Sequence, residues 1–286
     1  AASEVYKRQV IRDNKDRPSL TWIGHATFLV QLEGTNILTD PQFSERASPV
    51  SWAGPRRAPP PAMTVDELPE IDAVIISHDH YDSLDETSIR QLATHNKQGT
   101  LHFFVPLGFK AWFNRLGLEN IHVIELDWGE SHQLGAVTFT AEPVQHWGKR
   151  SLFDAFERLW ASWVMETNSQ RIFFAGDTGY AQHFKDIGSR YGHFDVALIP
   201  IGAYAPRWFM QSYHVNPAES VKMHQDLRSR YSVGMHWGTF ILTDEPLDEP
   251  PVKLAQALRL AEIPPSEFEV YTHGESRFLD HLFHEK

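Results

Sequence analysis

The chain has 286 residues, a formal net charge of -11 and no cysteine, and 42% of its residues are hydrophobic. This composition is typical of a soluble globular protein with a sizeable core. The negative charge argues against nucleic acid as a partner, and the absence of cysteine excludes disulfides and thiolate metal ligands. The compartment stays open between cytoplasm and periplasm, because a leader removed before Ala1 would leave no trace.

Strand-like and helical segments alternate along the chain after a polar peripheral arm, which we expect over residues 1–18. Strands are expected over residues 20–30 (with a turn at Gly24), 36–41, 73–77, 103–105, 122–126, 136–144, 162–166, 171–175, 196–201, 232–235 and 268–271. Helices are expected over residues 86–94, 108–116, 216–230 and 251–261, and a proline-rich surface loop over residues 48–61. This alternation predicts one α/β domain over residues 19–286.

One apolar run ends in His78-Asp79-His80-Tyr81-Asp82. In an extended segment alternate side chains point to the same side, so His78, His80 and Asp82 can converge while Asp79 and Tyr81 turn away. Two imidazoles and a carboxylate suit zinc, and also manganese or iron. The pattern therefore predicts a metal site.

Other apolar strands also stop at a histidine or an aspartate: Asp40, His146, Asp177 and His236, with His273 as a further candidate. Ligand sites in α/β proteins gather at the carboxyl ends of strands, so residues far apart in sequence can meet there. Asp177 lies between two glycines, which leaves its carboxylate room to approach two ions. We expect Asp40 to orient a metal ligand or a metal-bound water by a hydrogen bond, without binding the metal itself.

These motifs resemble the metallo-β-lactamase superfamily, in which a His-x-His-x-Asp-His motif precedes a later His, an Asp and a final His. Longer stretches are similar to the N-acyl-phosphatidylethanolamine phospholipase D-like branch of that superfamily. They include residues 21–27, 38–41, 43–49, 174–180, 200–204, 206–210 and 236–240. The resemblance extends from about residue 20 to residue 280.

The resemblance implies an αββα sandwich, with two mixed sheets flanked by helices and a binuclear metal centre at one edge. His78, His80 and His146 would bind the first ion, Asp82 and His236 the second, and Asp177 would bridge. A metal-activated hydroxide would attack phosphorus in a phosphodiester, either a phospholipid or a small diester. Zn²⁺ is the expected ion, and Mn²⁺ or Fe²⁺ are alternatives, especially at the second site. Residues that would position substrate or assist the leaving group, each with a structural role as the alternative, are His25, Tyr213, His214 and His273.

Ser83 departs from the motif, because the family has a second-metal histidine at this position. A serine hydroxyl is a poor zinc ligand, so the second site loses a nitrogen donor. Asp85 follows closely and is a further candidate near the metals. We therefore expect one tightly bound ion and one exchangeable ion.

Two other functions stay open: a lactonase or β-lactamase-like hydrolase of the same superfamily, and a non-catalytic metal-binding sensor or scaffold with a degraded second site. Peripheral membrane contact has two candidates, the proline-rich loop and the helix that carries Trp112 and Phe113. Core packing is the favoured interpretation of that helix. The sequence indicates no oligomeric state.

Overall fold

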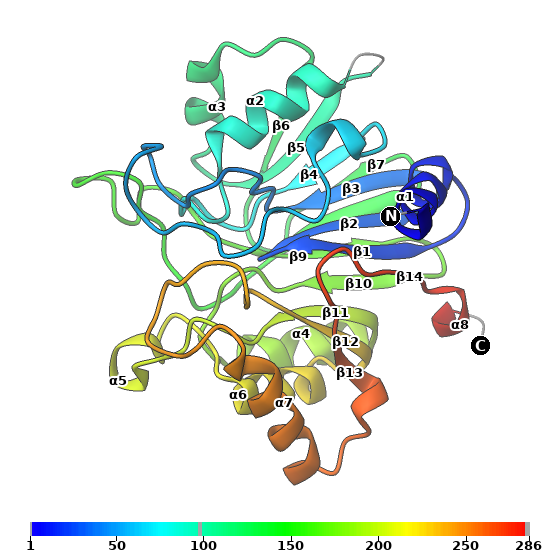
Figure 1. Ribbon diagram of the computed structural model, residues 1–286, viewed down its shortest axis with the longest axis vertical. Coiled ribbons are helices and arrows are strands. Elements are labelled where there is room, and N and C mark those ends of the chain that lie inside the picture. The colour runs from blue at the N-terminus through cyan, green and yellow to red at the C-terminus, as the bar shows by residue number, and fades with distance from the viewer. Residues whose placement is uncertain (1, 97–98, 284–286) are drawn as a thin grey trace.

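A computed structural model describes residues 2–96 and 99–283, so the ends of the predicted arm and domain, residue 1 and residues 284–286, lie outside the described residues. Over the described residues, two mixed sheets of seven strands each pack face to face, with helices on both outer sides (Figure 1). The predicted αββα sandwich is therefore confirmed.

The first sheet has the spatial order β14 (Ser276–Phe278), β1 (Ser19–Gly24), β2 (Thr27–Leu32), β3 (Thr35–Thr39), β4 (Ala73–Ile75), β5 (Leu101–Pro106) and β6 (Ile121–Leu126). The second has the order β13 (Phe268–Val270), β12 (Ser229–Met235), β11 (Phe194–Pro200), β10 (Arg171–Phe174), β9 (Ser162–Glu166), β8 (Val137–Glu142) and β7 (Ser131–Leu134). Strands β3 to β6 run parallel in the first sheet, and β10 to β13 run parallel in the second.

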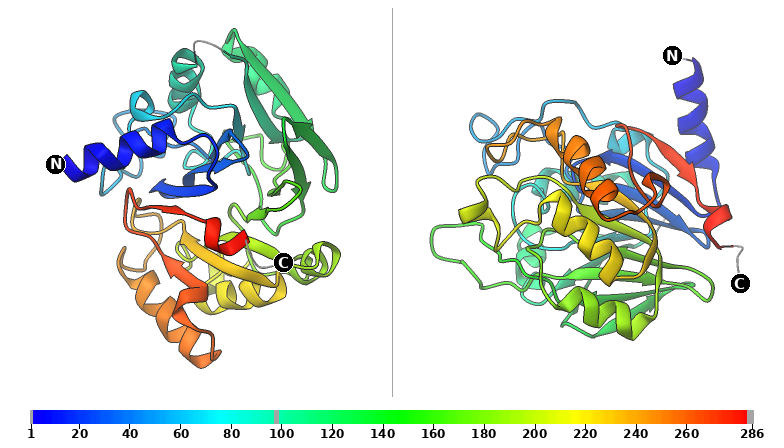
Figure 2. Two further views of the ribbon diagram at one scale, coloured as in Figure 1. Left: turned by 90° about the vertical axis from the view of Figure 1, so that its right-hand side faces the viewer. Right: turned by 90° about the horizontal axis from the view of Figure 1, so that it is seen from below.

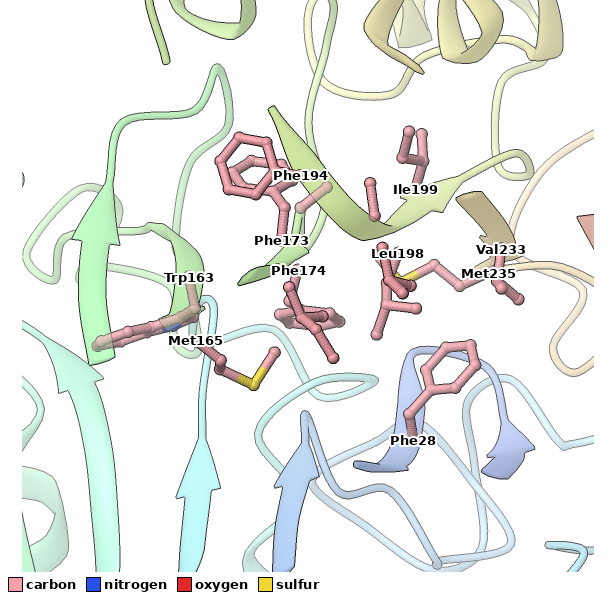
Figure 3. Packing of buried hydrophobic residues seen from close by; sticks show 14 of the residues in the cluster. Phe28, Trp163, Met165, Phe173, Phe174, Phe194, Leu198, Ile199, Val233 and Met235 are labelled. Atoms are coloured by element: carbon pink, nitrogen blue, oxygen red, sulfur yellow. The ribbon is translucent and has the colours of Figure 1, made fainter. Parts of the chain in front are cut away.

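Side-chain alternation along the strands builds two apolar layers. In β4, Ala73 and Ile75 face the cluster between the sheets, while Val74 faces the outer cluster of the first sheet. Figure 3 shows Phe28 of β2 pointing toward Leu198 and Met235 of the opposite sheet. Each large side chain buried in this way stabilises the fold by roughly 1.5–3 kcal/mol. The sheets are therefore held rigidly against one another by their inner faces.

The helices cover the outer faces. The helical elements are α1 (Ala2–Asp13), η1 (Val65–Glu67), α2 (Glu86–His95), α3 (Lys110–Leu116), α4 (His183–Tyr191), α5 (Arg207–Met210), α6 (Pro217–Asp226), α7 (Glu249–Leu260), η2 (Pro265–Glu267) and α8 (Asp280–Phe283). Helices α2 and α3 pack on the first sheet, and α4, α6 and α7 pack on the second (Figures 1 and 2). Trp112 and Phe113 of α3 are buried in the outer cluster of the first sheet, which confirms core packing rather than exposure to lipid.

Among the helices of the described residues, none combines the length and the apolar composition needed to cross a lipid bilayer.

The structure corrects one predicted helix and contains elements that were not predicted. The helix predicted over residues 216–230 ends at Asp226, because Arg228 adopts a left-handed conformation (φ 53°) and β12 already begins at Ser229. Helix α4 and strand β7 were not predicted. Strand β7 reads Ser-His-Gln-Leu and is mostly exposed, so it lacks the apolar alternation that marks a strand in sequence.

Candidate metal centre

The three histidines of the first predicted group converge at one edge of the sandwich. His78 and His80 lie in the segment between β4 and α2, and His146 lies in the segment after β8. The ring centroid of His78 lies 4.6 Å from that of His80 and 4.5 Å from that of His146. One nitrogen from each of the three rings lies within 4.8 Å of the others, a spacing within which one cation can be shared.

A second group lies beside the first, with His236 between two carboxylates. Nε2 of His236 lies 3.0 Å from Oδ2 of Asp177 and 3.3 Å from Oδ2 of Asp82. Oδ2 of Asp177 also lies 3.6 Å from Nε2 of His78, so this carboxylate stands between the two groups. His25 joins the second group, because its Nε2 lies 3.0 Å from Oδ2 of Asp82.

Asp40 is connected to the centre through Ser77. The carboxylate of Asp40 accepts hydrogen bonds from the Ser77 backbone N–H (2.7 Å) and from its Oγ (2.5 Å). Oγ of Ser77 also lies 2.8 Å from Nδ1 of His78. Burial raises the pKa of Asp40 well above its usual range, against the hydrogen bonds from Ser77 that lower it. In the ionised form of Asp40, Ser77 donates to Asp40 and accepts from Nδ1–H of His78, which leaves a free lone pair on Nε2 of His78.

His146 is oriented by the backbone of Tyr213. Nδ1 of His146 lies 3.0 Å from the Tyr213 carbonyl oxygen. A carbonyl can only accept, so Nδ1 carries the proton and Nε2 keeps a lone pair directed toward His80, 3.3 Å away. Tyr213 therefore contacts the centre through its backbone, and its role toward a substrate stays a prediction.

Burial sets the protonation of the centre. Burial lowers the pKa of His78 to about 3 and that of His214 to about 4, so both imidazoles are neutral at pH 7. Burial would raise the pKa of Asp82 and Asp177, but the neighbouring histidines outweigh it and hold both well below the usual range. Burial also opposes charge on His236, yet Asp177 and Asp82 raise its pKa to about 10.

Several buried donor atoms are left for a ligand. Nε2 of His78 and Oδ1 of Asp177 make no hydrogen bond to any described residue. A buried polar atom without a partner costs about 1–3 kcal/mol. Neutral imidazoles and ionised carboxylates are the donors that bind zinc, manganese and iron. The donor set therefore fits a divalent metal ion.

The remaining candidate residues lie around these groups. His214 contributes to a further potential ligand group with His146 and Asp177. Ser83 is fully buried, and its Oγ has no hydrogen-bond partner among the described residues. Asp85 caps α2 by accepting from Ser88 N (3.1 Å), and the ring of His273 packs 4.3 Å from that of Trp22.

Two arginines that the sequence patterns do not single out hold the motif segment. Asp79 turns away from the metal groups and is fully buried, with Oδ2 bonded to Nη1 of Arg158 (2.5 Å). Nη1 of Arg150 donates to the carbonyl oxygens of Asp79 (2.8 Å) and Leu84 (2.7 Å). The arginines follow the motif by more than sixty residues, so no local pattern connects them to it.

Comparison with known proteins places this centre in a family. Residues 35–237, which include all six predicted metal ligands, match the family described as "Beta-lactamase superfamily domain". The chain belongs to the metallo-β-lactamase superfamily. Its fold is also similar to that of a solved structure, an isothiocyanate hydrolase from Delia radicum gut bacteria, with a TM-score of 0.69, 20% identity, and coverage of 91% of this chain and 98% of that one.

Within the superfamily, the chain is 45% identical to N-acyl-phosphatidylethanolamine-hydrolyzing phospholipase D 1 of Caenorhabditis elegans, over 85% of this chain and 70% of that protein. It is 36% identical to the mitochondrial enzyme of the same description from Saccharomyces cerevisiae, over 82% of this chain and 50% of that protein. The predicted resemblance is confirmed, and the chain is a metal-dependent hydrolase of this superfamily. It spans only part of the length of these relatives.

We expect Ser77→Ala to lower the affinity of the His78 group for zinc by about 10- to 100-fold, because it removes the link between Asp40 and His78. Competition with a chromogenic chelator measures this affinity. Ser232→Ala is the matched control, since it removes a buried Ser–His contact (2.8 Å to Nδ1 of His224) outside the centre. Equal zinc affinities in the two variants would contradict the role given to Ser77.

We expect Arg158→Met to lower the free energy of unfolding by about 3–5 kcal/mol, because it leaves the buried Asp79 carboxylate without its partner. Urea unfolding of the metal-free protein measures the change. Arg90→Met, which breaks a half-exposed pair with Glu86, should change it by less than about 1 kcal/mol. Similar losses in both variants would show that Asp79 does not depend on Arg158.

Proposed function

We propose that this chain is a phosphodiesterase of phospholipase D type that hydrolyses a phospholipid at a two-metal centre. The observation that carries the proposal is an unbroken series of aromatic rings from the histidine groups to exposed apolar side chains. A metal centre explains hydrolysis, and an aromatic approach of this kind explains a substrate with long apolar chains. The names of the two curated relatives support the same substrate class.

The proposed ligands follow from the two groups. His78, His80 and His146 would hold the first ion, and Asp82 and His236 would hold the second, while Asp177 could serve both because it contacts His78 and His236. Zinc is the proposed metal, with manganese or iron as alternatives. Two divalent ions would supply a nucleophile from water at neutral pH and positive charge beside the phosphate oxygens.

The reaction is the hydrolysis of one P–O ester bond of the phosphodiester. The oxygen of a water molecule joins phosphorus, the P–O bond to the head-group alcohol breaks, and one proton passes to the departing alcohol oxygen. The role that we propose for His214 is a hydrogen bond to the phosphate or to the departing oxygen. Its ring centroid lies 5.3 Å from that of His146 and 5.4 Å from that of His236, and it is neutral at pH 7.

The aromatic series begins at Trp147, whose ring centroid lies 5.0 Å from that of His80. One branch continues to Phe156, at 5.9 Å from Trp147, and this side chain is 63% exposed. The other continues to Tyr213, at 5.8 Å from Trp147. Both branches lead from the metal-side rings toward solvent.

Beyond Tyr213 the series reaches α5. The ring of Phe209 lies 6.4 Å from that of Tyr213, and Trp208 lies 5.7 Å from Phe209. Trp208 is 85% exposed and Phe209 is 56% exposed. Large exposed apolar side chains that continue into a polar site suit an amphiphilic ligand, whose head group enters while its chains remain on the aromatic surface.

Asp177→Asn should lower kcat/KM for bis(4-nitrophenyl) phosphate by more than about 100-fold, because the carboxylate between both groups loses its charge. Prior treatment with a chelator should abolish wild-type turnover, and added zinc should restore it. Asp195→Asn, at another buried aspartate, is the control and should retain activity.

The same proteins are assayed with a lactone and a chromogenic cephalosporin. Chelator-sensitive turnover of a lactone without turnover of the diester would replace the proposed function with attack on a carbonyl. Full diester activity in Asp177→Asn would contradict the proposed centre.

The double variant Trp208→Ser/Phe209→Ser should reduce hydrolysis of a phospholipid in vesicles at least about tenfold, because it removes the exposed end of the aromatic series. Hydrolysis of bis(4-nitrophenyl) phosphate should be unchanged, since the metal ligands are untouched. Leu260→Ser, at an 88% exposed apolar residue at the end of α7, is the matched control. Equal losses on both substrates would contradict a lipid-specific role for α5.

A further inference from the structure

His25 belongs geometrically to the second group, although it lies far from the metal motif in sequence. Its Nε2 lies 3.0 Å from Oδ2 of Asp82, and its ring centroid lies 4.0 Å from that of His236. One ligand atom from each of His25, Asp82 and His236 lies within 4.8 Å of the other two. Two imidazoles and a carboxylate at this spacing form a donor set for a divalent cation.

Ser83 makes this geometry informative. The side chain is fully buried, and a neutral hydroxyl offers zinc a much weaker donor than an imidazole. Without another residue, the second ion would have one nitrogen, from His236, and two carboxylates. The ring of His25, which follows β1, supplies a second nitrogen beside the Asp82 carboxylate.

Hydrogen bonds hold the backbone of His25 in place, and one of them comes from His236, the other histidine of the second group. The His25 carbonyl accepts from the N–H of His236 (3.0 Å) and from Nε1 of Trp22 (3.0 Å). The His25 N–H donates to Oγ1 of Thr239 (2.9 Å). The second group is therefore assembled by direct bonds between the turn that follows β1 and the segment that follows β12.

His25 also has a strained backbone, with φ at 55°, and so has His236, with φ at 59°. Left-handed conformations are unfavourable for residues other than glycine. Such strain persists where the surrounding structure requires a particular side-chain direction. Here it directs two imidazoles toward the same carboxylate, Asp82.

We infer that His25 is the second nitrogen ligand of the second metal ion and supplies the donor that Ser83 lacks. The inference rests on the two-metal centre of the proposed function but not on its substrate. It replaces the expectation of an exchangeable second ion, because a site with two imidazoles, Asp82 and the shared Asp177 retains zinc as a complete ligand set does.

Zinc itself is the probe, measured on the full chain. Stoichiometry is determined by elemental analysis after gel filtration, and both affinities by chelator competition. Wild type should retain two ions. His25→Ala should keep the first ion with unchanged affinity and lose at least about 100-fold in affinity for the second. The double variant His25→Ala/Ser83→His should regain affinity for the second ion to within about tenfold of wild type.

His25→Gln separates a ligand from a residue that only positions Asp82. The amide of glutamine can still donate a hydrogen bond to the carboxylate, but it lacks the imidazole nitrogen that zinc prefers. We expect His25→Gln to behave as His25→Ala. Substitution with cobalt(II) gives a second readout, because the visible bands of the second ion should shift in both single variants and recover in the double variant.

Three results would overturn the inference: a wild type that retains one ion, a His25→Ala protein with two unchanged affinities, or full rescue of the second ion by glutamine. Recovery of the second ion in His25→Ala/Ser83→His also shows that the variant folds. If the metal results hold and only lactones are hydrolysed, the proposed function fails while the assignment of His25 stands.

Discussion

The contact of His236 with Asp82 and Asp177 is the constraint on which the rest of the centre depends. Nε2 of His236 lies within 3.3 Å of a carboxylate oxygen on each side, and all three side chains are buried. Two carboxylates removed from water repel one another and lose hydration, so they need positive charge between them. His236 can carry that charge as an imidazolium, and divalent ions can carry it when the imidazoles act as ligands. The surrounding hydrogen bonds hold the imidazoles and carboxylates in one arrangement, in which either protonated His236 or divalent ions can supply the positive charge.

The sandwich brings these groups together because each sheet delivers part of the set at one edge. The first sheet provides His25 after β1, Asp40 after β3 and the motif after β4, and the second provides His146, Asp177 and His236 after β8, β10 and β12. Close approach of the two sheets has a steric requirement. A side chain at Gly176 would place its Cβ 2.5 Å from Cβ of Ser77, and φ at this position is 61°. Glycine there lets the segment of Asp177 lie directly against the segment of His78.

Strand ends rich in histidine and aspartate predicted an α/β domain with a metal site where these ends meet, because both depend on local alternation and on a repeated pattern. The αββα arrangement and the division of ligands between two ions came from the family resemblance. The partner of His25 could not be predicted in that way. Asp82 and His236 are 57 and 211 positions away from His25, and only tertiary packing joins them. The same limit applies to Asp85, whose place beside the motif suggested the metals. Its Oδ2 accepts hydrogen bonds from the N–H and Oγ of Ser88 and from Oγ of Ser44, because the start of α2 exposes N–H groups that need an acceptor.

A nitrogen donor from the β1–β2 turn would change what the second ion does for the fold. In the first group, His78 and His80 are close in sequence, so an ion there closes one long loop, to His146. The second group joins His25, Asp82 and His236, and the last two are 154 positions apart. An ion shared by these three residues closes two long loops and ties β1 of the first sheet to β12 of the second. Loop closure restricts the unfolded chain more as the loop lengthens. The second ion would therefore stabilise the junction of the two sheets. His25 would replace the nitrogen donor that Ser83 lacks, and because it lies in the β1–β2 turn, metal binding there would also stabilise the sandwich.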